Sequence, residues 1–100
     1  MKKKGINRMI IQIVNEYFES QDFNDKANEN TVLFGKESVL DSMDLVNIII
    51  DIESIFLDEG YEISLTSEKA MSRRNSPFRT ISTLAEFIEE QIFEKEQSDE

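Results

Sequence analysis

The sequence feature that most constrains the fold is an apolar stripe with helical spacing, which recurs in three long stretches of the chain. The stretches span residues 4–20, 42–57 and 80–95. In each of them apolar residues recur every three or four positions, which predicts a helix that turns one face toward a core. The stripe residues are Ile6, Met9, Ile10, Ile13, Val14, Tyr17, Phe18, Leu45, Ile48, Ile49, Ile52, Ile55, Phe56, Ile81, Leu84, Ala85, Ile88 and Ile92.

A long polar loop is expected between the first two helices, because residues 21–39 are rich in Asn, Asp and Glu. Val32, Leu33 and Phe34 are the apolar residues expected to pin this loop to the core. The acidic residues of the loop do not follow the spacing of an EF-hand, so no metal site is predicted there.

Residues that end or interrupt a helix separate the later helices. Gly60 predicts the end of the second helix. The alternating residues 61–65 have no obvious partner strand, so they are expected to form an extended connector that places Ile63 in the core. A short helix is expected over 66–72. The predicted fold is therefore an all-α four-helix bundle, with three longer helices, one short helix and a long loop after the first.

Composition restricts the class of protein. One hundred residues with a net charge of −10 predict a single domain over 1–100, with an acidic tail that frays from about residue 97. The chain has neither Cys nor His, the commonest sources of a nucleophilic thiol and of a base near neutral pH, so an enzyme is not predicted. Negative charge disfavours nucleic acid and favours partners with basic surfaces. Nothing resembles a membrane span or a signal peptide, so a cytoplasmic monomer is expected.

Asp41 and Ser42 stand where the long loop ends and the second helix begins. Asp41 suits the N-cap and Asp44 adds a carboxylate to the first turn, each contributing about 0.5–1 kcal/mol. Ser42 then takes the first helical position, with its hydroxyl toward solvent beside free N–H groups that favour a phosphate. From spacing alone, an ordinary capped helix start is the simpler explanation, since capping residues are common.

Residues 41–46 (Asp-Ser-Met-Asp-Leu-Val), with the apolar helix and Glu53 after them, resemble the acyl carrier protein signature of Asp-Ser-Leu and an amphipathic recognition helix. The resemblance covers most of the chain, but its specific part surrounds Ser42. It implies that a phosphopantetheinyl transferase, using coenzyme A and magnesium, attaches 4′-phosphopantetheine to Ser42. Acyl or aminoacyl groups would then be carried as thioesters to loading and transfer enzymes. Leu40 departs from the Gly that many members have there, which bears on the cargo more than on the fold.

A second apolar row is expected on the far side of the second helix. At about 100° per residue, Met43, Val46 and Ile50 project away from the core stripe. An exposed patch of this kind usually marks an interface. With its polar rim, the predicted partner-binding set is Met43, Asp44, Val46, Asn47, Ile50, Asp51 and Ser54. The alternative is that the apolar residues pack beneath the loop that precedes Ser42.

Two further alternatives follow from the sequence. An unmodified acidic helical adaptor that docks on basic partners would share the charge, the helices and the apolar row, but it would not need Ser42. Arg73, Arg74 and Arg79 form a basic island in a connector that is longer than the one usual in the resembled family. Charge balance against neighbouring acids is the simpler explanation of the island, and a contact with one partner is the functional one.

Overall fold

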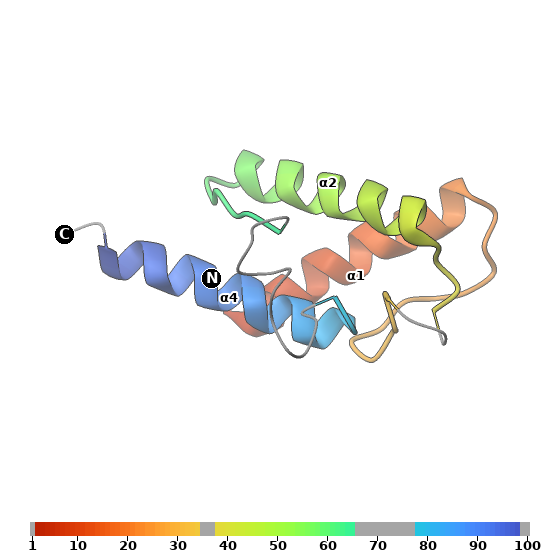
Figure 1. Cartoon of the computed structure of the whole chain (residues 1–100), viewed down its shortest axis with the longest axis horizontal. Helices are drawn as coiled ribbons and strands as arrows, with labels where there is room; N and C mark the ends of the chain where they lie inside the picture. The colour runs from red at the N-terminus through yellow and green to blue at the C-terminus, as the bar shows by residue number, and fades with distance from the viewer. Residues whose placement is uncertain (1, 35–37, 66–77, 99–100) are drawn as a thin grey trace.

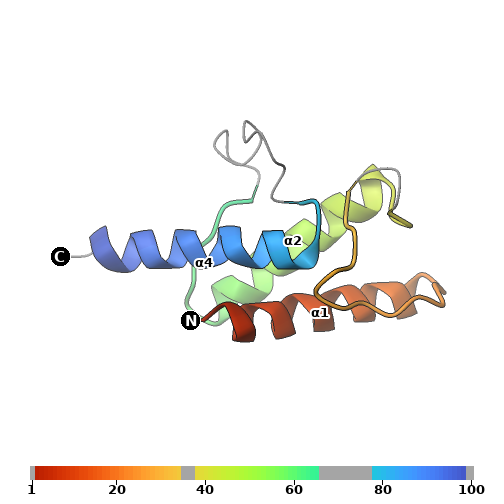
Figure 2. The ribbon, with the colours of Figure 1, turned by 90° about the horizontal axis from the view of Figure 1, so that it is seen from below.

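The computed structural model describes residues 2–34, 38–65 and 78–98, which contain three helices. These are α1 (Lys3–Ser20), α2 (Ser42–Asp58) and α4 (Ile81–Ser98). α1 packs against both other helices and runs in the opposite direction to each of them (Figures 1 and 2). Within the described ranges there is no strand, and Val32 and Thr80 form an isolated antiparallel bridge. The all-α prediction is confirmed, whereas the short helix expected over 66–72 lies outside the described residues.

The core forms where the three stripes meet. Every predicted stripe residue is buried except Met9, Tyr17 and Ile55, which are partly buried against the same cluster. Phe87, which the predicted stripe of the last helix did not include, adds a ring with 2% exposure. The helical period of the sequence therefore identifies the core-facing side of each helix.

The long loop is pinned to the start of α4. The Leu33 N–H donates to the Arg79 carbonyl at 2.9 Å, and the Ile81 N–H donates to the Thr31 carbonyl at 3.1 Å. Leu33 is buried and Val32 is partly buried, but Phe34 is 55% exposed, so the prediction that Phe34 anchors the loop is wrong. Side chains alternate between faces in extended backbone, so the bridge turns Leu33 inward and its neighbour outward.

The connector after α2, residues 61–65, forms neither helix nor strand. Ile63 lies in the core, as predicted, and Leu65 is buried as well. Two side chains hold its backbone. The Gln91 amide of α4 accepts from the Ser64 N–H at 2.9 Å and donates to the Ser64 carbonyl at 2.8 Å. Glu53 of α2 accepts from the Leu65 N–H at 2.8 Å. These bonds satisfy backbone groups that have no strand partner.

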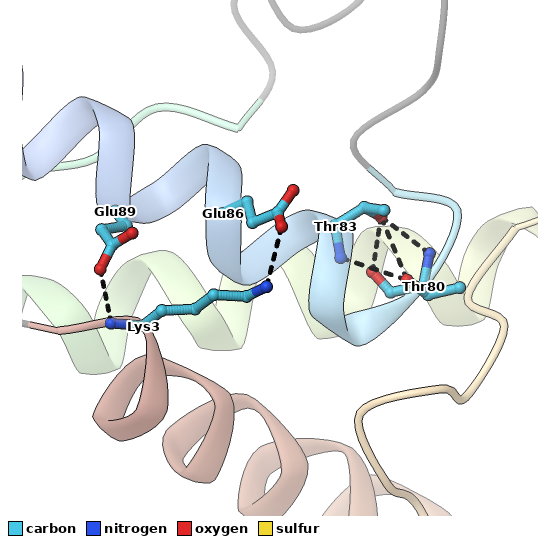
Figure 3. Close-up of polar contacts among 5 residues, drawn as sticks. All are labelled: Lys3, Thr80, Thr83, Glu86 and Glu89. Atoms are coloured by element: carbon cyan, nitrogen blue, oxygen red, sulfur yellow. Dashed lines mark hydrogen bonds and ion pairs between the residues drawn. The ribbon is translucent and has the colours of Figure 1, made fainter.

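α4 begins with a reciprocal cap and is joined to the start of α1 (Figure 3). The Thr83 N–H donates to Thr80 Oγ1 at 3.1 Å, and the Thr80 N–H donates to Thr83 Oγ1 at 3.0 Å. The Lys3 backbone N–H donates to Glu89 at 2.6 Å, and Lys3 Nζ pairs with Glu86 at 2.8 Å. Glu89 thus supplies a carboxylate to the first turn of α1, which has no acid of its own.

The last helix is longer than predicted. We expected it to end near Lys95 and to fray from about residue 97, but α4 continues to Ser98. Residues 94–97 are Glu, Lys, Glu and Gln, all good helix formers, and no Gly or Pro interrupts them.

Of the three arginines of the predicted basic island, Arg79 is exposed, and Arg73 and Arg74 lie outside the described residues.

α1 and α2 end in the same backbone motif with different residues at its left-handed position. After α1, the Phe23 N–H donates to the Phe18 carbonyl at 2.9 Å and Asp22 has φ 61°. After α2, the Tyr61 N–H donates to the Phe56 carbonyl at 2.8 Å and Gly60 has φ 91°. Both are Schellman caps, for which glycine is the residue without a steric cost.

We expect Asp22→Gly to stabilise the protein and Gly60→Ala to destabilise it, each by about 1 kcal/mol, because a β-carbon disfavours left-handed backbone. A β-carbon at Gly60 would meet no atom within 4 Å, so the loss would be conformational and not steric. Urea unfolding of both variants measures the change. A stabilised Gly60→Ala protein would contradict this account of the caps.

Candidate functional site

The turn that carries Ser42 is closed by a capping box. Asp41 is the N-cap of α2, and its Oδ1 accepts from the Asp44 N–H at 2.9 Å. Asp44 Oδ2 accepts in return from the Asp41 N–H at 3.1 Å. The prediction of Asp41 as N-cap is confirmed, and the carboxylate of Asp44 closes the box, a role that sequence reasoning did not assign to it.

Leu40 fixes the direction from which the chain enters this turn. Leu40 is the residue before the N-cap, and Leu45 is the fourth residue of the helix. A hydrophobic staple joins apolar side chains at these two positions. Both side chains are 8% exposed and belong to the core. The residue that departs from the resembled signature therefore anchors the turn. The spacing of Leu40 and Leu45 in the sequence could have predicted this staple, but sequence reasoning did not use it.

Ser42 is the first residue of α2 and is exposed. Among the described residues, none forms a hydrogen bond with its hydroxyl. The capping box uses the N–H groups of Asp41 and Asp44, whereas those of Ser42 and Met43 have no acceptor within the helix. An exposed hydroxyl beside unpaired N–H groups and the positive end of a helix dipole suits attachment of a phosphate group.

Tyr17 joins the end of α1 to the Ser42 turn. Its hydroxyl donates to Asp44 Oδ1, while the other oxygen of Asp44 accepts from Asp41. The hydrogen bond from Tyr17 lowers the pKa of Asp44. The pKa of Tyr17 is raised, chiefly by the same hydrogen bond and to a smaller extent by partial burial of the ring. We predicted Tyr17 only as a core residue, because no sequence signal pairs it with a side chain beyond the long loop.

The Tyr17–Asp44 bond predicts a pH-dependent loss in Tyr17→Phe. A lowered Asp44 pKa contributes stability above its unfolded value of about 3.9, which disappears as pH falls through the folded pKa. A raised Tyr17 pKa contributes stability below its unfolded value of about 10, which disappears as pH rises through the folded pKa. We expect the variant to melt below the parent protein between about pH 5 and 9, with the gap closing toward either extreme. A gap of constant size across all pH values would contradict this assignment.

The predicted partner-binding residues lie where the helical register placed them. Met43, Val46 and Ile50 are 69%, 48% and 54% exposed, so the loop before Ser42 does not cover them. Leu57, 60% exposed, continues this row one heptad beyond Ile50, a spacing that sequence reasoning missed. The remaining predicted residues are Asn47, Asp51 and Ser54, which are exposed, and Asp44, which is partly exposed.

The flank of α2 that faces α1 carries a groove of about 340 Å³. Tyr17 and Ser20 line it from α1, and Asp51 and Ile55 line it from α2. Asp51, one of the predicted partner-binding residues, therefore also borders this groove. In the described parts of the chain, no group of three or more acidic side chains could hold a metal ion, and no helix is both long and apolar enough to cross a bilayer.

Comparisons with known proteins do not assign a family to this chain. No protein-family model, no curated protein and no solved structure matched it. The functional interpretation therefore depends on the residues of the site and on the resemblance around Ser42.

Proposed function

We propose that this chain is a carrier protein whose Ser42 receives 4′-phosphopantetheine and then holds acyl or aminoacyl groups. The observation that supports it best is the position of Ser42, an exposed hydroxyl at the first residue of a rigidly capped helix. The Asp-Ser motif, its amphipathic helix and the all-helical fold agree with this proposal. Phosphopantetheinyl transferases and loading or transfer enzymes with basic surfaces are the proposed partners.

The roles of the chain's own residues follow from their positions. Ser42 Oγ would attack the phosphate of coenzyme A that carries the pantetheine arm, forming a phosphodiester and displacing adenosine 3′,5′-bisphosphate. The transferase would supply the base that takes the hydroxyl proton, because this chain has no His. The capping box fixes the turn, and Leu40 and Tyr17 attach it to the core and to α1. Once attached, the arm would provide a thiol that carries the cargo as a thioester. Tethering then raises the concentration of the cargo at any enzyme docked on α2.

Substitution of Ser42 tests the proposal. With coenzyme A, magnesium and a broad-specificity transferase, the parent protein should gain one phosphopantetheine and Ser42→Ala should gain none. Ser64→Ala is the matched control, since Ser64 is an exposed serine in the connector, and it should be modified like the parent protein. Modification of Ser42→Ala would overturn the assignment of the site.

The second candidate function is an unmodified acidic adaptor. The exposed apolar row on α2 favours it as much as it favours a carrier, because either protein needs a docking face. The two proposals differ at Ser42. An adaptor with Ser42→Ala would bind its partners and act like the parent protein, whereas a carrier with this substitution would lose its function completely.

A further inference from the structure

The groove between α1 and α2 is a part of the molecule that the proposed function does not use. Its volume of about 340 Å³ lies within the roughly 300–1,000 Å³ of small-molecule sites. We call it the α1–α2 groove, and its lining consists of Ile13, Glu16, Tyr17, Ser20, Asp51 and Ile55. These residues include neither Ser42 nor any member of the exposed apolar row on α2.

The floor of the α1–α2 groove is apolar and is held in place by the protein itself. Ile13 is 4% exposed, and Ile55 and Tyr17 are partly buried against the same core. The Tyr17 hydroxyl donates to Asp44, and Ser20 Oγ donates to the Tyr17 carbonyl at 2.8 Å. These bonds fix the ring without a ligand, and a pre-formed groove costs little ordering entropy on binding.

The rim of the α1–α2 groove carries negative charge that nothing nearby neutralises. Glu16 of α1 and Asp51 of α2 are both exposed, and they reach the groove from opposite helices. Within the parts of the chain that the structure describes, neither forms a salt bridge, and Glu16 accepts only from the Gln12 amide at 3.4 Å. α1 ends beside the groove with no basic residue in its last turn, so its dipole adds partial negative charge.

We propose that the α1–α2 groove binds a linear aliphatic diamine, with one ammonium group at each carboxylate and the methylene chain along the floor. The uncompensated charge selects a cation. Methylene groups packed against Ile13, Ile55 and the Tyr17 ring would leave water, which a hydrated metal ion could not achieve. Among the described residues, no group of three or more acidic side chains could hold a metal ion instead. The inference goes beyond the proposed function, because it does not involve Ser42.

Titration of the ¹⁵N-labelled protein with cadaverine, followed by amide chemical shifts, tests the proposal. The ionic strength should be about 0.15 M, at which charges more than about 8 Å away are largely screened. The shift changes should concentrate at residues 13–20 and 51–55. Glu16→Gln and Asp51→Asn should each weaken binding about threefold, which is within the range for an exposed ion pair. Glu62→Gln is the matched control, because it removes one exposed charge outside this groove, and it should leave binding unchanged.

The proposal is overturned if Glu62→Gln weakens binding as much as the two groove variants, because net charge alone would then attract the diamine. It is also overturned if the shift changes lie elsewhere, or if neither groove variant weakens binding. Pentanediol should not bind, and its binding would contradict the role of the carboxylates. Pentylamine should bind about threefold more weakly than cadaverine, since it meets one carboxylate, and equal binding would contradict the two-ended arrangement.

Ser42→Ala separates this inference from the carrier function. The variant should bind cadaverine like the parent protein, although it would receive no phosphopantetheine. Failure of the diamine site and failure of the carrier function are therefore separate results.

Discussion

Phe56→Ala should destabilise the protein by about 3–5 kcal/mol, which is a large part of the stability of a domain of this size. Phe56 is completely buried, and its carbonyl also accepts the hydrogen bond that ends α2. Removing the ring leaves a cavity at the point where α2 meets the connector. The free energy of unfolding in urea measures the loss.

Leu57→Ala is the matched control for this substitution. Leu57 is the next residue along α2 and has a large apolar side chain, but it is 60% exposed. Its truncation should change the free energy of unfolding by no more than about 0.5 kcal/mol. Similar losses for the two variants would mean that the helical register of α2 is wrong.

Val46→Glu and Ile50→Glu, made singly, should reduce transfer of phosphopantetheine to Ser42 by at least about tenfold, the typical effect of losing an interface hot spot. Each adds a negative charge to an apolar row that a basic partner would cover. Both side chains are about half exposed, so helicity and melting temperature should change little. Initial rates of modification, followed by mass spectrometry, measure the effect.

Phe93→Glu controls for the added charge, because Phe93 is similarly exposed but lies on α4. It should be modified at the rate of the parent protein. If Val46→Glu and Ile50→Glu are modified as fast as Phe93→Glu, the row on α2 is not the surface that the transferase contacts. If either variant unfolds, its residue belongs to the core.

Structural features that depend only on residues close by in the sequence could be predicted. The N-cap Asp41, the left-handed Gly60 and the division of α2 into buried and exposed faces all follow from residues within one or two turns. Periodicity also separates Phe56 from Leu57, although they are adjacent. Local patterns are sufficient where the helix itself determines which side chains face the core.

Features that depend on the path of a loop could not be predicted. Tyr17 and Asp44 are 27 residues apart, and their hydrogen bond depends on how the long loop returns to α1. Phe34 is exposed because a single bridge decides which way the side chains of that segment alternate. The sequence therefore predicted that α2 begins at Ser42 and is capped by Asp41, but it did not predict the contact that joins this turn to α1.

The intact mass of the unsubstituted chain, before and after incubation with coenzyme A, magnesium and a phosphopantetheinyl transferase, tests the central claim most directly. We expect the mass of the whole population to rise by one phosphopantetheine, and fragmentation to place that group on Ser42. An unchanged mass with several transferases, or a group attached to another serine, would contradict the carrier function.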